Sequence, residues 1–261
     1  MSKTLWIYGD SFAVDWKVDW GWQRILVNGL PDVDRVVNQA CSGCSNDWIA
    51  KCFKDDAHKP NDYVIMMPTE SSRQGFWKDR PHLSNLPSIV DTPDAAQLKK
   101  KEPEKYQAVI DYFVHLQDHK VDELRLEHFA YAVRVIMIER ELNLRVIPSF
   151  MSNWNYTDLV YTNGNMTFSI CDQEFQHPSE MTLWYQQSID TRANHMVQNN
   201  HQVFAHKLID SYLHNTSIDL EQGFDRHFLA HTDKLTADGL LPELLDMARA
   251  PGNTIPSAHN T

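Results

Sequence analysis

The chain has 261 residues, of which 42% are hydrophobic and 11% aromatic. This composition is sufficient for a sizeable core in one large α/β domain or two small ones, and it excludes a wholly disordered chain. Acidic residues (35) outnumber basic residues (24), and the resulting net charge of −11 disfavours binding to a phosphate backbone. No apolar run reaches the length of a membrane-spanning helix, so we expect neither a nucleic-acid nor a membrane partner.

Cysteine content and the N-terminal residues bear on the cellular compartment. The first residues lack the long apolar region and cleavage site of a signal peptide, so we expect a cytoplasmic protein. The four cysteines are too few and too unevenly placed for a disulfide framework. Cys41 and Cys44 form a Cys-x-x-Cys, but no second pair accompanies them. We therefore interpret both as small buried residues and expect no metal site.

Apolar runs and helical periodicities alternate along the chain. Strands are expected where short apolar runs end at turn residues, at 5–8, 33–40, 62–67, 144–150 and, as a short last strand, 217–220. Helices are expected over 22–30, 46–53, 104–117, 122–142, 180–213 and 238–248. This alternation predicts a three-layer α/β/α sandwich with a mainly parallel, five-stranded sheet.

The predicted domain spans residues 1–250, with a flexible tail over 251–261. Residues from 76 to about 103 are polar and contain several prolines. We interpret this stretch as a long surface insertion. One role for such an insertion is a lid over a binding site.

The first predicted strand ends in the sequence Gly9-Asp10-Ser11. A serine on a tight turn after a strand presents its hydroxyl at the edge where α/β folds bind ligands. The same turn can aim the Ser11 backbone N–H at a developing oxyanion. Asp10 is interpreted as structural, because a carboxylate beside the turn can accept loop N–H groups.

With this motif after its first strand, the sequence resembles the SGNH hydrolases, also called the GDSL esterase/lipase superfamily. The resemblance implies that Ser11 is the nucleophile. Residues 38–46, directly after the second strand, look like the family's second block, and Gly43 would there donate its backbone N–H to the oxyanion hole. A residue without a Cβ lets the backbone approach a substrate closely. Members with similar insertions occur in bacteria and bacteriophages, so a phage source would imply a virion-associated protein.

This sequence departs from the family's pattern in the third block. Members usually place Gly-x-Asn-Asp after the third strand, and the Asn side chain is the third oxyanion donor. Here residues 68–73 read Pro-Thr-Glu-Ser-Ser-Arg, without Asn. Thr69, Ser71, Ser72 and Arg73 are the alternative donors, of which we select Ser71 and Arg73 as oxyanion or substrate-binding candidates. Arg73 has a second interpretation, an ion pair with Glu70.

The final block of the family supplies an Asp and a His before the last helix. Asp225 and His227 fit an Asp-x-His form of it, with His227 as general base and Asp225 as the residue that orients it. The run Leu235-Thr236-Ala237-Asp238-Gly239 matches the residues that usually follow the His directly. If His227 is the base, an insertion separates it from this run. The alternatives are that His231 is the base or that the base is lost.

These residues lead us to expect a serine esterase that hydrolyses carboxylic esters through an acyl-enzyme, without metal or cofactor. Its substrate would be a small-molecule or polysaccharide ester. O-acetyl groups on a polysaccharide are one such substrate, because the family contains carbohydrate esterases and Trp16, Trp20 and Trp22 follow Ser11. Core packing is the alternative role of these tryptophans. The competing interpretation of the whole chain is a catalytically impaired SGNH-like module with a binding or structural role in an assembly.

Overall fold

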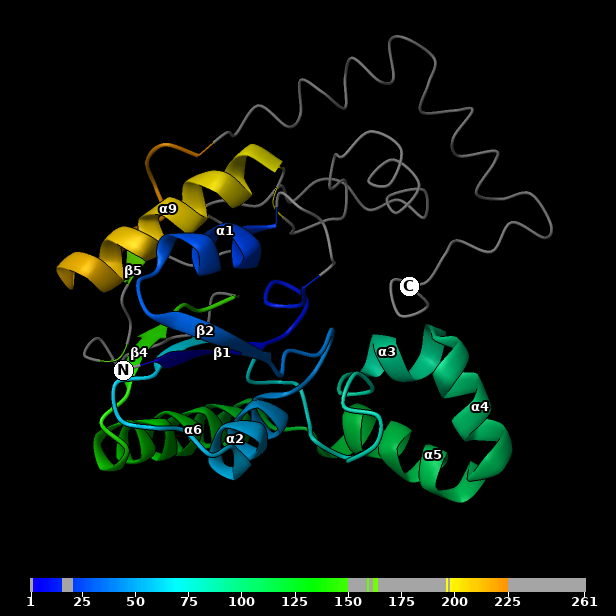
Figure 1. Ribbon diagram of the computed structural model, residues 1–261. Helices are drawn as coiled ribbons and strands as arrows, with labels where there is room; N and C mark the ends of the chain where they lie inside the picture. The colour runs from blue at the N-terminus through cyan, green and yellow to red at the C-terminus, as the bar shows by residue number, and fades with distance from the viewer. Residues whose placement is uncertain are drawn as a thin grey trace, which may run out of the picture. The chain divides into compact units, whose positions relative to one another are not determined.

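The computed structural model describes residues 2–15, 21–149, 159, 162–163, 196 and 198–224. The chain divides into two compact units, one made of Met1–Val14 and Asp32–Tyr161 and the other of Asp15–Pro31 and Thr162–Thr261. The first unit contains a parallel sheet and the second a pair of helices (Figure 1).

The sheet of the first unit has four parallel strands in the order β2-β1-β3-β4. Their bounds are β1 Lys3–Gly9, β2 Val33–Asn38, β3 Tyr63–Met67 and β4 Asn143–Val146. β1 pairs with two neighbours, so that Ile7 lies between Asn38 of β2 and Ile65 of β3. β3 is buried along its whole length, as expected for a parallel strand covered on both faces. The prediction of an α/β fold with a parallel sheet is confirmed.

The predicted strand count is wrong for the described part of the chain, where this sheet has four strands and not five. Residues 217–220, expected as the fifth strand, do contain a short strand, β6 (Ile218–Asp219). β6 pairs instead with β5 (Thr162–Asn163) in a separate two-stranded sheet. The Asn163 side chain fixes that pairing, since its amide donates to Asp219 Oδ1 at 2.9 Å and its Oδ1 accepts the Leu220 N–H at 2.7 Å.

Two helices cover one face of the four-stranded sheet, α2 (Asn46–Asp55) and α6 (His119–Glu139) (Figure 1). Alternate residues of β1, β3 and β4 face them, which is the period of two that a strand imposes. The buried cluster between helices and sheet comprises Trp6, Tyr8, Cys44, Ile49, Phe53, Val64, Met66, Leu126, Phe129, Ala130, Val133, Leu142, Leu144, Val146 and Leu159. α2 begins as expected, with the Ser45 side chain accepting the Trp48 N–H as an N-cap.

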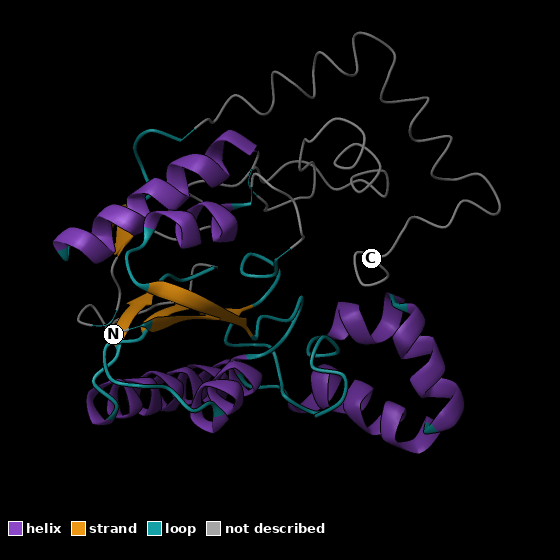
Figure 2. Ribbon diagram, viewed as in Figure 1, coloured by secondary structure: helices purple, strands orange, loops and turns teal. Residues whose placement is uncertain are grey.

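The predicted surface insertion is helical. It contains α3 (Leu86–Asp91) and α4 (Pro93–Lys101), and α5 (Pro103–Asp111) and the π-helical turn η1 (Tyr112–Leu116) follow (Figure 2). These helices enclose an apolar cluster of their own, made of Trp77, Leu83, Ile89, Ala95, Leu98, Tyr106, Val109 and Phe113. Three of the insertion's four prolines, Pro87, Pro93 and Pro103, stand in the first turn of α3, α4 and α5, where a missing N–H costs nothing.

The second unit contains α1 (Trp22–Gly29) and α9 (Gln198–His214), which pack against each other. Trp22 is fully buried and meets Phe204 edge-to-face, with ring centroids 5.4 Å apart. A Cβ on Gly29 would lie 2.2 Å from Ile209 Cδ1, so this glycine allows the close approach of the two helices.

A buried aspartate, Asp62, lies at the amino-terminal edge of the sheet, directly before β3. It is 1% exposed and accepts three hydrogen bonds, each of 2.9 Å, from the Thr4 N–H, the Trp6 indole and the Lys59 N–H. These bonds link the start of β1 to the residues before β3.

Replacing Asp62 with alanine is therefore expected to destabilise the fold. Three donors would lose their charged acceptor, and we expect the free energy of unfolding to fall by about 3–5 kcal/mol. Urea denaturation followed by circular dichroism measures this change. Asp34→Ala is the matched control, because Asp34 is an exposed aspartate on β2. Equal stabilities of the two variants would show that the Asp62 bonds add nothing to stability.

Candidate functional site

The strand order places a topological switch point between β1 and β3. From β1 the chain proceeds outward to β2, and it then returns past β1 to β3 and on to β4. In open α/β sheets, ligands bind outside the carboxyl ends of the strands at such a point. The loops after β1 and β3 are thus the first place to look for a site.

Ser11 lies in the tight turn that follows β1. The turn is closed by the Ala13 N–H, which donates to the Asp10 carbonyl at 3.0 Å, and by the Phe12 N–H, which donates to Asp10 Oδ1 at 3.2 Å. Ser11 itself is half-buried. Gly9 is required just before it, because a Cβ there would lie 2.8 Å from the Cβ atoms of both Ala13 and Met67.

Asp10 is a buried carboxylate with no exposed surface. Ser149, just beyond β4, donates its hydroxyl to Asp10 Oδ1 at 3.3 Å, and Arg73 Nη1 lies 3.7 Å from Oδ2. Burial raises the pKa of Asp10 above its ordinary value, and the nearby Arg73 guanidinium opposes that rise. The interpretation of Asp10 as a structural brace of the turn is confirmed by its bond from the Phe12 N–H.

The loop after β2 is held against the end of β1. The Gly9 carbonyl accepts the Cys41 N–H at 3.0 Å and the Cys44 thiol at 3.3 Å. Within this loop Gly43 has a φ of +72°, a conformation that favours glycine. The Gly43 carbonyl accepts the Ser84 hydroxyl, so residues just before α3 contact this loop.

The loop after β3 is fixed by Asn46, the first residue of α2. Its side chain accepts the Thr69 N–H at 2.9 Å and donates to the Thr69 carbonyl at 3.0 Å. A turn follows in which the Arg73 N–H donates to the Glu70 carbonyl, and Ser71 stands half-buried inside it. Arg73 Nε also donates to Glu70 Oε2 at 3.2 Å, so the predicted ion pair with Glu70 is present.

Four of the six predicted site residues therefore stand on three neighbouring loops: Ser11, Gly43, Ser71 and Arg73. Asp225 and His227 lie outside the described residues, as do the alternative His231 and the run 235–239. Sequence reasoning missed Asn46 and Ser149. Ser149 follows the predicted fourth strand, so the rule that parallel strands share one carboxyl edge would have found it.

The cysteines and tryptophans of the sequence motifs have packing roles where the structure describes them. Cys41, Cys44 and Cys52 are free thiols. Burial raises the pKa of Cys41 to about 11 and raises the pKa of Cys44 well above its ordinary value, which disfavours the reactive thiolate at both positions. Trp22 and Trp77 lie in apolar cores, whereas Trp16 and Trp20 fall outside the described residues.

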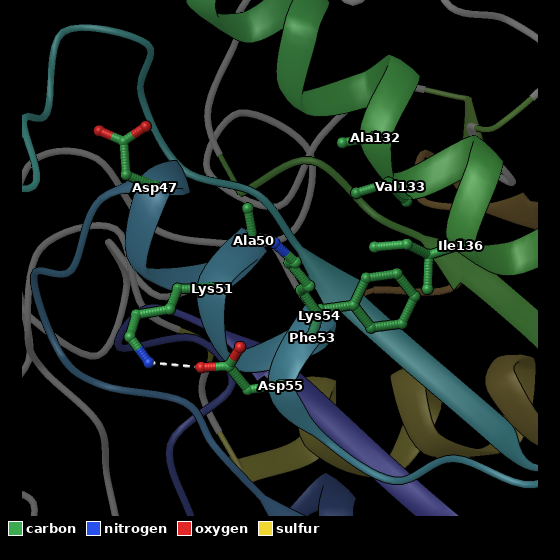
Figure 3. A pocket seen from close by; sticks show the side chains of 9 residues that line it. All are labelled: Asp47, Ala50, Lys51, Phe53, Lys54, Asp55, Ala132, Val133 and Ile136. Atoms are coloured by element: carbon green, nitrogen blue, oxygen red, sulfur yellow. Dashed lines mark hydrogen bonds and ion pairs between the residues drawn. The ribbon is translucent and has the colours of Figure 1, made fainter.

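A groove of about 340 Å³ lies between α2 and α6 (Figure 3). Its apolar lining is Ala50, Phe53, Ala132, Val133 and Ile136, and its charged lining is Asp47, Lys51, Lys54 and Asp55. It lies between two helices rather than at the carboxyl ends of the strands and contains no residue of the predicted site. We do not assign it to that site.

Comparison with known proteins adds no assignment: no protein-family model and no curated protein matches the chain. Within the described ranges, no helix combines the length and hydropathy needed to cross a bilayer. The same ranges contain no group of three His, Cys, Asp or Glu side chains arranged to hold a metal ion.

A second titratable cluster lies at the C-terminal end of α2. Arg140 Nη1 is 2.6 Å from His58 Nδ1, and His58 Nε2 is 2.7 Å from the Tyr8 hydroxyl. A guanidinium only donates, so Nδ1 accepts and the proton of the neutral ring is on Nε2. The Tyr8 hydroxyl in turn donates to Asp56 Oδ2 at 2.8 Å. Burial, together with the Arg140 charge, lowers the pKa of His58 to about 4.

This lowered pKa predicts a loss of stability in acid. Between pH 6.5 and 4 the unfolded chain takes up a proton at His58 that the folded chain does not, so the free energy of unfolding falls as the pH falls. His58→Gln keeps an acceptor and a donor without titrating, and we expect it to lose this part of the slope. Urea denaturation of the wild type and of His58→Gln across that pH range measures how the free energy of unfolding of each changes with pH. Nuclear magnetic resonance showing a proton on Nδ1 of the neutral ring would contradict the assignment.

The raised pKa of Asp10 predicts a pH dependence of stability that is opposite in sign to that of His58. The folded chain holds the Asp10 proton to higher pH than the unfolded chain, so this group's contribution to the free energy of unfolding falls as the pH rises above 3.8. Asp10→Asn removes the titration, and its stability relative to wild type should therefore improve as the pH rises. Urea denaturation over a pH series measures this, with Asp34→Asn as the exposed control. A relative stability that worsens with rising pH would overturn the assignment.

Proposed function

We propose that this protein is a serine-dependent carboxylic ester hydrolase with Ser11 as nucleophile. The supporting observation is the position of Ser11 in a tight turn at the carboxyl end of β1, beside the β1/β3 switch point. The Gly43 loop is hydrogen-bonded to the residue at the end of the same strand. A hydroxyl and a glycine loop at one sheet edge are two of the parts that acyl transfer needs, the nucleophile and an oxyanion donor.

In the proposed reaction, Ser11 Oγ attacks the ester carbonyl carbon and His227 takes the hydroxyl proton. The backbone N–H groups of Ser11 and Gly43 stabilise the oxyanion of the tetrahedral intermediate. His227 returns the proton to the leaving alcohol, and an acyl-serine remains. Water then attacks the acyl-serine by the same route and releases the acid. Asp225 orients the imidazole and stabilises its protonated form.

The wider assignment follows the same proposal. The chain would be an SGNH-type hydrolase with a single three-layer α/β/α domain, acting without metal or cofactor in the cytoplasm, or in a virion if the source is a phage. Its substrate would be a small-molecule or polysaccharide ester, with carbohydrate O-acetyl groups as one class. His82 and Ser84, just before α3, lie against Gly43, which supports a role for the helical insertion in lining the proposed substrate site.

One observation favours the second candidate, a catalytically impaired module that binds rather than hydrolyses. The loop after β3 has no Asn to act as an oxyanion donor, and its Arg73 lies against two carboxylates, Asp10 and Glu70. Loss of one oxyanion donor lowers the rate by about 100- to 1000-fold. A hydrolase with this loop would be slow unless Ser71 or Arg73 turns toward the substrate.

Hydrolysis of p-nitrophenyl acetate and butyrate separates the two candidates. We expect turnover by the wild type and labelling by a fluorophosphonate probe, and we expect Ser11→Ala to reduce both by at least about 1000-fold, because the nucleophile is lost. Ser217→Ala, at an exposed serine, is the control and should retain both. No turnover and no labelling of folded wild-type protein would overturn the hydrolase proposal in favour of the binding module.

A further inference from the structure

Ser84 is a fully buried serine that contacts two of the loops at the carboxyl edge of the sheet. Its hydroxyl donates to the Gly43 carbonyl in the loop after β2. Its own carbonyl accepts the Gln74 N–H, at 2.7 Å, from the loop after β3. Because β1 lies between β2 and β3 in the sheet, Ser84 joins the loops on either side of the turn that contains Ser11.

Gly43 lies in a four-residue turn that leaves its N–H unused. The Cys44 N–H donates to the Cys41 carbonyl at 3.1 Å, and Gly43, the third residue, has a φ of +72°, as in a type II turn. No described residue accepts the Gly43 N–H. The peptide between Gly43 and Cys44 is bonded at both ends, since Ser84 donates to its carbonyl and its N–H closes the turn. The turn that presents the unused N–H is therefore held from outside by Ser84.

The segment that contains Ser84 is itself fixed to the helices of the insertion. Asn85 follows directly and begins α3 with a capping box. His82 Nε2 lies 2.7 Å from Asp94 Oδ2 on α4, and the His82 carbonyl would lie 3.2 Å from a Cβ on Gly43. A functional group is held more precisely by residues on helices than by residues on loops. The two helices thus give Ser84 a fixed position against the Gly43 turn.

From these contacts we infer that Ser84 is a positioning residue for the Gly43 N–H, through which the insertion supports the oxyanion hole. The inference rests on the proposed function, in which this N–H stabilises the oxyanion. The oxyanion forms only as the ester carbonyl is attacked, so a misplaced N–H lowers kcat and leaves substrate binding unchanged. A lid would have to move away from the loops that Ser84 joins, whereas a support stays in contact with them.

Kinetics with p-nitrophenyl acetate test this role against a merely structural one. Ser84→Ala should lower kcat about tenfold, less than the outright loss of an oxyanion donor, and should leave KM within about twofold. Ser211→Ala is the matched control, because Ser211 of α9 is equally buried and donates its hydroxyl to a backbone carbonyl, that of Thr216, at 2.6 Å. It should lower the melting temperature but keep the wild-type kcat. Ser84→Cys is a second variant of nearly the same shape, and its weakly donating thiol should also lower kcat if alanine prevents folding.

Nuclear magnetic resonance follows the Gly43 N–H without requiring turnover. Of the nine glycines only Gly43 follows a serine. Isotopic labelling of serine at its carbonyl carbon and of glycine at its nitrogen therefore isolates a single amide resonance in a spectrum that correlates the two atoms. Ser84→Ala should shift this resonance, because the turn loses its external bond, and Ser211→Ala should leave it in place.

The two measurements separate this inference from the esterase proposal. A Ser84→Ala variant that keeps the wild-type kcat, or one that keeps the wild-type Gly43 resonance, would overturn the inference. A wild type without turnover would overturn the esterase proposal, and the Gly43 resonance would then decide whether Ser84 holds the turn.

Discussion

The first unit depends on a carboxylate that has no contact with solvent. Asp10 receives a backbone N–H from the turn after β1, a hydroxyl from beyond β4 and the charge of Arg73 from beyond β3. It thereby joins the carboxyl ends of three strands of the sheet. A buried carboxylate is costly unless such partners surround it, so the loops that present them are constrained to one arrangement. The turn containing Ser11 is part of that arrangement.

This constraint also governs what Arg73 can do. Its guanidinium lies between Asp10 and Glu70 and balances a charge in the interior, with only 11% of the side chain exposed. Moving it toward a substrate would leave the Asp10 carboxylate with less compensation. The same residue is thus both a support of the fold and a candidate binding group, and these two roles compete.

Much of this architecture was predictable from local patterns. The apolar runs ending in Gly9 and Pro68 gave strands at the expected places, and Ser45 predicted the start of α2. The insertion is predicted less well, because proline usually marks a break in a helical pattern, whereas Asn85 and Thr92 here cap helices that contain proline in their first turn. The pairing of β6 with β5 depends on Asn163, more than fifty residues away, and no local pattern contains such a contact. Sequence motifs selected Ser11 and Gly43 as candidates, and both lie on loops at the carboxyl edge of the sheet. The Asn46–Thr69 pairing beside them is likewise a contact between distant segments.

Arg140 links the ends of two helices. It stands just after the last residue of α6, yet its guanidinium donates to the Lys54 and Asp56 carbonyls at the end of α2, at 2.8 and 2.7 Å. The carbonyls at a helix C-terminus have no partners within the helix, and they carry the negative end of its dipole. One helix therefore supplies the C-terminal cap of the other. In the hydrogen-exchange behaviour of the folded protein, the last turns of α2 and α6 should open as one cooperative unit, because neither can fray without releasing the same guanidinium.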